Sequence, residues 1–145
     1  MDLPLTAAVV SHLEVLTDAG STNEILSERA RESFSSPHLS VLLTDNQTAG
    51  RGRLGRSWTA APGASLAVSV LLRRLPSADA RGWIPLAAGV AMADAIAEQL
   101  PDHAVAVKWP NDVLVDGRKI CGILAQATQD LSLIHISEPT RPERI

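Results

Sequence analysis

The segment AVAVKWPNDVLVDGRKICGILA, residues 104–125, decides more of the fold than any other part of the sequence. It begins with an apolar, strand-like run over 104–109, which Pro110 ends because proline has no backbone N–H to donate. Two further apolar runs then flank Asp116-Gly117. Asp-Gly is among the best two-residue turns, since both central residues of a type I′ turn need a positive φ. The segment therefore predicts a strand followed by a tight β-hairpin.

The register of this hairpin places one lysine in an apolar strand. A two-residue turn pairs Leu114 with Lys119. The period of two along a strand then puts Lys119 on the same face as Cys121 and Ile123. A lysine on an otherwise apolar face either extends its ammonium to solvent or points into a site. Gly122 in the same strand is typical of a position that a ligand approaches closely.

Two segments before the hairpin predict a strand and a long helix. Residues 65–72 alternate large and smaller apolar residues, as in a half-buried strand. Residues 83–100 predict the helix, since Pro85 suits its first turn and Pro101 stops it. The three-four spacing gives this helix one apolar face, made of Leu86, Gly89, Val90, Ala93, Ile96, Ala97 and Leu100.

The first third of the chain predicts a strand, a helix and a strand. Residues 12–17 and 39–43 are strand-like. Ser21 with Glu24 three residues later is a capping box, so a helix begins there and runs to about Ser33. The whole order of elements predicts an α+β domain with a largely antiparallel or mixed sheet.

Composition and charge exclude several classes of protein. With 145 residues, 46% hydrophobic and 20% charged, the chain is typical of one soluble globular domain with a real core. Its net charge of −3 disfavours a general nucleic-acid binder, because such domains are more often basic. The apolar stretch 3–10 is too short to span a membrane and lacks a basic region before it.

Cysteine and histidine predict neither a disulfide nor a metal centre. Cys121 is the single cysteine, so no intrachain disulfide forms, which fits a reducing compartment and a cytoplasmic protein. The four histidines are scattered without zinc-like spacing, and we assign no metal-ligating residues. Cys121 itself is expected to be a small core residue rather than a nucleophile.

Residues 44–61 form a long polar segment around GRGRLGR, residues 50–56. The pattern G-x-G-x-x-G of a dinucleotide fold turns directly from a strand into a helix, but no helix is predicted here, so we disfavour that interpretation. Glycines expose backbone N–H groups, and guanidinium groups suit phosphate and carboxylate. Arg51, Arg53 and Arg56 therefore predict an anion-binding loop that a ligand orders; the alternative is a solvated flexible loop.

The run Lys108-Trp109-Pro110-Asn111-Asp112 leaves a strand and makes a turn. Pro110 restricts Trp109 to an extended conformation, and Asn111 and Asp112 are turn formers. Lys108 then lies at a strand end, where ligands commonly bind, and Asp112 is suited to hold a lysine, an arginine or a hydrated Mg²⁺. The alternative is a strand terminator with a buried tryptophan.

Four motifs have an order and spacing that are shared with one enzyme family. They are Gly20-Ser21-Thr22-Asn23, residues 47–58, residues 108–112 and residues 118–124. Together they resemble the catalytic domain of the biotin–protein ligases, over about Leu13 to Ala127. The resemblance implies the mixed sheet packed with helices of the class II tRNA-synthetase and biotinyl/lipoyl ligase superfamily. It also implies two steps: the biotin carboxylate attacks the α-phosphate of ATP, which gives biotinyl-5′-AMP and pyrophosphate, and a lysine amine then attacks this mixed anhydride and releases AMP.

The resemblance also assigns roles position by position. Biotin binding is implied for Ser21, Thr22, Asn23, Gln47, Gly50, Arg51, Lys119, Gly122 and Ile123. Binding of ATP or the adenylate is implied for Gly52, Arg53, Gly55, Arg56, Trp58, Lys108, Asn111 and Asp112. Lys119 is implied as the main electrostatic catalyst, with Arg51 and Lys108 as further catalytic cations and Asp112 as the organiser of Lys108. The implied ligands are ATP, biotin and Mg²⁺, and the implied partner is the biotin carboxyl carrier domain of a carboxylase; a homodimer is a further option.

The end of the sequence departs from the family. From about Leu131 the run SLIHISEPTRP resembles a translated sequencing adapter. We therefore predict that residues 1–130 are the N-terminal part of the catalytic domain and residues 131–145 a non-native tail; the alternative is a genuine final strand with a proline-rich tail. The family's Gly-x-Gly-x-Asn segment and C-terminal β-barrel are not present. Nor is a helix-turn-helix, so no DNA partner is expected.

Two rival functions use the same residues. A lipoate-type ligase of the same superfamily shares the adenylation chemistry, but its Arg-Arg-x-Ser-Gly-Gly-Gly loop is not seen. An RNA-binding module would grip a single strand with the arginine-glycine loop, but only Trp58 offers it a stacking surface. Biotin titration by calorimetry, with and without ATP, separates all three.

Because the predicted fragment lacks partner strands for its sheet and one wall of its site, we predict that the chain is poorly stable and weakly active. The measurement is biotin-dependent pyrophosphate exchange by the purified chain. Turnover at the rate of a complete ligase would contradict this prediction.

Overall fold

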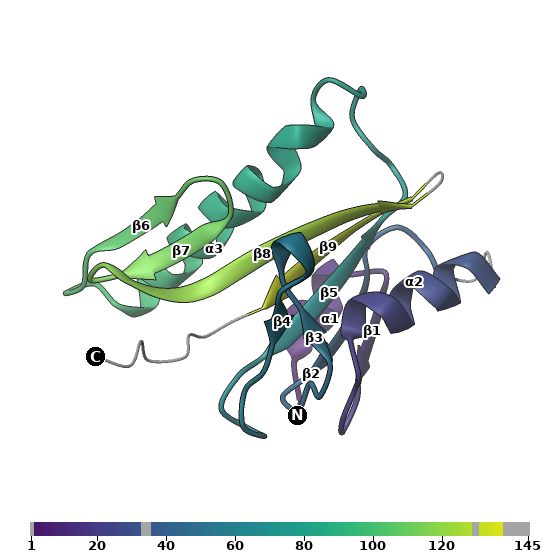
Figure 1. Ribbon diagram of the computed structural model, residues 1–145, viewed down its shortest axis with the longest axis horizontal. Helices are drawn as coiled ribbons and strands as arrows, with labels where there is room; N and C mark the ends of the chain where they lie inside the picture. The colour runs from purple at the N-terminus through teal and green to yellow at the C-terminus, as the bar shows by residue number, and fades with distance from the viewer. Residues whose placement is uncertain (1, 33–35, 129–130, 138–145) are drawn as a thin grey trace.

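The computed structural model describes residues 2–32, 36–128 and 131–137. Its main feature is a seven-stranded sheet in the order β1-β2-β5-β9-β8-β7-β6 (Figure 1). The pair β1–β2 is parallel and the other neighbours are antiparallel, which confirms the predicted mixed sheet. The strands are β1 (His12–Val15), β2 (Ser40–Thr44), β5 (Ala67–Leu72), β6 (Val105–Lys108), β7 (Asp112–Val115), β8 (Arg118–Thr128) and β9 (Leu131–Ser137).

Each half of the sheet packs against its own helix. Helix α2 (Thr22–Glu32) covers the half that contains β2 and β5, where Leu26 and Ala30 meet Leu42 and Leu71. Helix α3 (Ile84–Gln99) covers the half made of β6, β7 and β8, as Figure 1 shows. A short helix, α1 (Pro4–Val9), precedes β1. No helix in the described residues is long and apolar enough to cross a membrane.

Helix α3 confirms the predicted element and part of the predicted face, since Gly89, Ala93 and Ile96 pack toward the sheet. Its buried residues are Gly89 and Ala93, which lie over β6–β8. Val90, expected on the same face, is 47% exposed, and Ala97 and Leu100 are exposed as well. The reason is that α3 is apolar almost all round, so spacing alone does not distinguish the side that meets the sheet.

The hairpin confirms the predicted turn and register, with Asp116 at φ 50° and Gly117 at φ 76°. Leu114 pairs with Lys119 as expected, but Val113 pairs with Cys121, so the returning strand contains one extra residue. This β-bulge reverses the alternation, because cross-strand partners share a face. The prediction that Lys119 shares a face of the strand with Cys121 and Ile123 is therefore wrong. Cys121 and Ile123 are buried in the core with Val113, and Lys119 lies on the opposite face.

The start of α2 confirms one half of the predicted capping box. The N–H of Glu24 donates to the hydroxyl oxygen of Ser21 at 3.4 Å, and the helix begins at Thr22. The carboxylate of Glu24 does not complete the box, because it pairs with Arg51 instead. The capping residue and the helix start were thus predicted correctly, whereas the partner of Glu24 was not.

Strand β9 is formed by residues that the sequence assigns to a tail. It lies between β5 and β8 and pairs with both. It thereby joins the half-sheet β1-β2-β5 to the half-sheet β8-β7-β6, which are not neighbours otherwise. The division of the chain at residue 130 stays a prediction.

The hairpin turn is fastened to the start of β6 by a carboxylate. Asp116 accepts a hydrogen bond from the N–H of Ala104 at 2.9 Å, and its second oxygen lies 2.6 Å from Nδ1 of His103. The hydrogen bond with His103, and then the bond from Ala104, lower the pKa of Asp116 below its usual 3.8. A carboxylate whose pKa is lowered by folding stabilises the fold above its ordinary pKa, and that stabilisation is lost as the pH falls through the folded pKa.

We predict that Asp116→Asn makes unfolding less sensitive to acid. Asparagine retains the tolerance of positive φ, so the turn stays intact while the charge is removed. Urea unfolding at several pH values should show a steeper fall in stability for the wild type than for the variant between about pH 5 and about pH 3. Asp102→Asn, which removes the same charge from the neighbouring exposed loop, is the control. Parallel pH profiles for wild type and Asp116→Asn would contradict the prediction.

Candidate functional site

The arginine-glycine segment folds into a small two-stranded ribbon. Strand β3 (Gly50–Arg51) pairs with β4 (Ser57–Trp58), and a single 3₁₀ turn, η1 (Arg53–Gly55), forms the tip. The N–H of Gly52 donates to the carbonyl of Arg56 at 2.7 Å and closes the tip. The glycine motif leads into strand β4 and not directly into an α-helix, which agrees with the argument against a dinucleotide-binding fold.

The ribbon faces the turn after β6 and the start of β8 across a cavity of about 450 Å³. Arg51 and Lys119 both line this cavity, so the two cations that the sequence analysis relies on share one site. Its wall holds five cationic side chains but one carboxylate, that of Asp112, and is therefore suited to an anion. The lining residues are Arg51, Gly52, Arg53, Leu54, Arg56, Ser57, Trp58, Lys108, Trp109, Pro110, Asn111, Asp112, Lys119, Gly122, Ile123 and Leu124.

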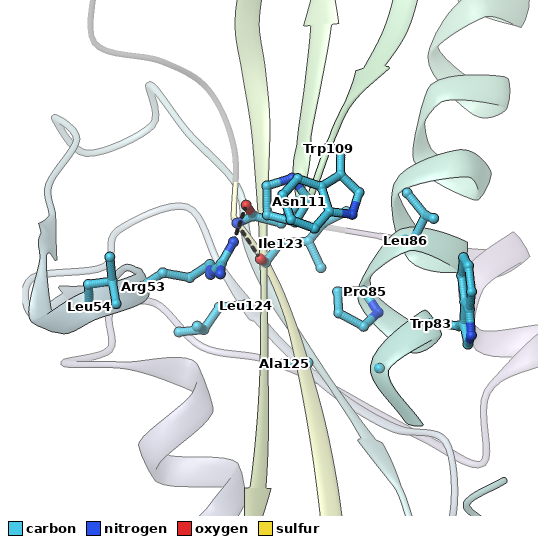
Figure 2. Close-up of a pocket in the computed structure, with 12 residues that line it drawn as sticks. Arg53, Leu54, Trp83, Pro85, Leu86, Trp109, Asn111, Ile123, Leu124 and Ala125 are labelled. Atoms are coloured by element: carbon cyan, nitrogen blue, oxygen red, sulfur yellow. Dashed lines mark hydrogen bonds between the residues drawn. The ribbon is translucent and has the colours of Figure 1, made fainter. Parts of the chain in front are cut away.

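A second cavity, of about 530 Å³, adjoins the first and extends to the N-terminal end of α3. Figure 2 shows Arg53 and Leu54 on one side of it and Pro85, Leu86 and the indole of Trp83 on the other, with Trp109 between them. Trp109 is 78% exposed, so the alternative of a buried tryptophan at this strand end is wrong. The cationic cavity therefore adjoins a larger hollow, which apolar side chains line for the most part.

Lys119 is held by two neighbours inside the cavity. Its ammonium nitrogen lies 2.6 Å from Oδ1 of Asp112, in an ion pair rather than an aligned hydrogen bond. The same nitrogen lies 5.6 Å from the centroid of the Trp58 ring, which attracts a cation through its π face. The ion pair of Asp112 is with Lys119, although Asp112 is also the cross-strand partner of Lys108 in β6–β7, so its role as the organiser of Lys108 stays a prediction. The β-bulge explains the ion pair, since it turns Lys119 to the face of β8 that carries Gly122, the partner of Asp112.

Asn111 connects the ribbon, the turn and the hairpin. Its side-chain amide nitrogen donates to the backbone carbonyl of Ile123 at 2.8 Å. In return, the backbone carbonyl of Asn111 accepts a hydrogen bond from the backbone N–H of Ile123 at 2.8 Å. Its side-chain oxygen accepts a hydrogen bond from the guanidinium of Arg53 at 3.1 Å (Figure 2). Arg53, predicted to bind the adenylate, is thereby aimed at the cavity by a residue of the turn.

Four of the nine residues predicted to bind biotin do not line the cavity but form a buried polar cluster, each at most 6% exposed. They are Ser21, Thr22, Asn23 and Gln47. Oε1 of Gln47 accepts from the backbone N–H of Thr22 at 3.0 Å and from its hydroxyl at 3.2 Å. This pairing fixes the amide orientation, because an N–H must meet the oxygen. Nε2 of Gln47 and Oδ1 of Asn23 are left buried without a hydrogen-bond partner among the described residues.

Two contacts connect the polar cluster to the ribbon. Gly50 is buried with Gln47 and Trp58 against its Cα, in space that a side chain would occupy. Arg51, next along, forms an ion pair with Glu24, the residue after Asn23. Gly55, in contrast, lies at the ribbon tip and does not line the cavity, so its predicted contact with the adenylate is not supported by this geometry.

Sequence reasoning missed several residues of the site. Ser69 donates its hydroxyl to Oγ1 of Thr22 at 2.9 Å, and Oε1 of Gln126 accepts from the amide of Asn23. Neither belongs to a recognisable motif, because both reach the cluster from strands that only the sheet brings close. The cavity residues Leu54, Ser57, Trp109, Pro110 and Leu124 were missed too, although each lies within or beside a quoted motif.

We predict that Gly50→Ala destabilises the chain by about 1–3 kcal/mol, a range typical of overpacking. A Cβ at this position would lie 2.5 Å from Nε2 of Gln47 and 2.7 Å from the backbone oxygen of Trp58, and the backbone contact is not relieved by a rotamer change. Gly52→Ala is the matched control, since its Cβ would make ordinary contacts at 3.5 Å or more. Urea unfolding of both variants checks the prediction, and equal losses of stability would contradict it.

Comparison with known proteins identifies the family. Residues 17–137 match the biotin/lipoate A/B protein ligase family. The chain is 40% identical over 127 residues to the biotin–[acetyl-CoA-carboxylase] ligase of Mycobacterium tuberculosis, covering 86% of this chain and 47% of that protein. It is 37% identical over 114 residues to the bifunctional ligase/repressor BirA of Escherichia coli, covering 79% and 34%. The chain thus spans less than half the length of these relatives.

Solved structures agree with this match. The biotin protein ligase of Leishmania major, in complex with biotinyl-5-AMP, superposes with a TM-score of 0.77 at 27% identity, over 92% of this chain and 61% of that one. The biotin protein ligase of Aquifex aeolicus, in complex with biotin and ATP, superposes with a TM-score of 0.74 at 30% identity, over 93% and 55%. The predicted fold is confirmed, and the family model matches most of the chain. This chain therefore belongs to the biotin/lipoate A/B protein ligase family.

Proposed function

We propose that this chain carries adenylate-forming machinery that activates biotin with ATP to biotinyl-5′-AMP, for transfer to a lysine of a biotin carboxyl carrier domain. The observation that carries the proposal is the convergence of Arg51, Arg53 and Lys119 on one cavity beside the buried polar cluster. Relatives named as biotin ligases support the biotin substrate. Neighbouring structures that hold biotin with ATP, or biotinyl-5-AMP, support the intermediate.

The buried polar cluster suits the head of biotin. A buried donor or acceptor without a partner costs about 1–3 kcal/mol, so the unpaired Nε2 of Gln47 and Oδ1 of Asn23 favour a ligand that supplies both kinds of partner. A cyclic urea has a carbonyl acceptor and two N–H donors. The dithiolane ring of lipoate has neither, and this difference favours biotin over lipoate as the substrate.

The cationic cavity suits the reacting end of the substrates. Attack of a carboxylate on the α-phosphate brings two anions together and builds negative charge on the phosphoryl oxygens. Lys119, steadied by Asp112 and Trp58, offers an ammonium at that point, and Arg51 and Arg53 offer forked donors on the opposite wall. The ribbon tip then shields the mixed anhydride from water, which would hydrolyse it.

Mg²⁺ enters this proposal as part of the nucleotide substrate. Asp112 is the one carboxylate in the cavity wall, and it is paired with Lys119. The described residues contain no group of three or more His, Cys, Asp or Glu side chains suited to a metal. The donor set therefore does not fit a resident metal ion, and the cation is expected to arrive bound to the ATP phosphates.

Transfer to the acceptor needs a neutral lysine amine that attacks the anhydride carbonyl and releases AMP. The exposed Trp109 and Trp83 beside the second cavity leave this side of the site open to a protein partner. The cytoplasmic location, the lack of a DNA partner and the homodimer remain predictions.

We predict that Lys119→Gln lowers the rate of biotin-dependent pyrophosphate exchange by roughly a hundredfold or more, as for loss of one electrostatic donor. Biotin binding, followed by calorimetry, should weaken much less, because the urea-binding cluster is untouched. Arg74→Gln, which removes the same charge from an exposed loop outside the cavity, serves as the control. Unchanged exchange by Lys119→Gln, or heat of binding from lipoate but not from biotin, would count against the proposed function.

A further inference from the structure

Arg51 is turned toward a carboxylate that lies outside the cavity. Its Nε is 2.5 Å from Oε1 of Glu24, and the two side chains are 62% and 46% exposed. Among the cations of the cavity wall, Lys119 is paired with Asp112 and Arg53 is bonded to Asn111, both of which line the same cavity. Glu24 does not line the cavity. Arg51 is therefore drawn toward the rim by its partner, whereas Lys119 and Arg53 are held within.

Glu24 is itself well positioned for this contact. It lies in the first turn of α2, where its backbone N–H donates to the capping hydroxyl of Ser21. The preceding residues Thr22 and Asn23 are buried in the polar cluster. Arg51 follows the buried Gly50, whose Cα packs closely against Gln47 and Trp58. The start of α2 and strand β3 thus bring a carboxylate and a guanidinium together beside the cavity.

We infer that Glu24 is a positioning residue that competes with the anionic substrates for Arg51. The inference rests on the proposed function for the identity of those substrates. With no ligand bound, the Glu24 carboxylate occupies the guanidinium of Arg51 from outside the cavity, and it offsets the repulsion between Arg51 and the other cations. Binding of the substrates exchanges one anion for another at the same guanidinium. Glu24 therefore sets how tightly the site holds anions.

The expected effect is modest, because exposed ion pairs contribute little. Removing the competing charge should tighten anion binding about two- to fivefold, which corresponds to the usual strength of such pairs. The effect should shrink as salt is added, since screening weakens the pair that is being removed. A role in folding alone would leave the affinity of the anion site unchanged.

The test is a double-mutant cycle with Glu24→Gln, Arg51→Gln and the double variant, using inorganic pyrophosphate as the probe in calorimetry at low and moderate salt. Glu24→Gln should bind pyrophosphate about two- to fivefold more tightly than the wild type, and it should change nothing when Arg51 is already replaced. Glu28→Gln, one turn further along α2 and also exposed, is the control for a charge effect that does not involve Arg51.

The outcomes separate this inference from the proposed function. The inference is overturned if Glu24→Gln tightens pyrophosphate binding equally with and without Arg51, or if Glu24→Gln weakens that binding. It is also overturned if the wild-type chain binds no pyrophosphate. In biotin-dependent pyrophosphate exchange, Glu24→Gln should lower KM for ATP with little change in kcat, the mark of a ground-state competitor. If biotin gives no heat while the cycle behaves as expected, the inference about Glu24 holds and the proposed substrate is wrong.

Discussion

The site depends on one electrostatic constraint, which is the crowding of five cations around a cavity with one carboxylate in its wall. Like charges that face one cavity repel, and a partner that a substrate is able to replace relieves that repulsion. The fold supplies such partners for three of the five cations, from different elements: Asp112 and the Trp58 ring for Lys119, Asn111 for Arg53, and Glu24 for Arg51. Each motif therefore contributes either a cation or the group that steadies a cation from another motif.

The backbone enforces this division through one irregularity in an otherwise regular hairpin. Without the extra residue between Lys119 and Cys121, the lysine would share the face of Ile123 and point at α3. The bulge lets β8 bury Cys121 and Ile123 in the core while Lys119 and Gly122 line the cavity, whose wall also includes part of Ile123. Because of this one extra residue, one face of β8 packs in the apolar core and the other face contributes a cation to the site.

Local signals in the sequence predicted most of the sheet strands and the two long helices, but not α1, the β3–β4 ribbon or the place of β9 in the sheet, and they did not predict which faces are buried. Asp116-Gly117 fixed the hairpin register because the turn needs only its own two residues, and Ser21 fixed the start of α2 for the same reason. The bulge and the exposed side of α3 depend on which strand packs where, which no window of sequence contains. Gln126 reaches Asn23 across more than a hundred residues, a contact that only the assembled sheet creates.

The buried polar cluster shows why binding and stability are coupled in such a site. Thr22 and Gln47 satisfy each other, but Nε2 of Gln47 and Oδ1 of Asn23 remain buried without partners among the described residues. Each such atom costs about 1–3 kcal/mol, a sizeable share of the 5–15 kcal/mol by which folded domains are usually stable. A ligand that pairs both atoms recovers that free energy only in the folded state. The fold therefore accepts a less stable empty cluster, and under the proposed function the urea of biotin is the group that would pair both atoms.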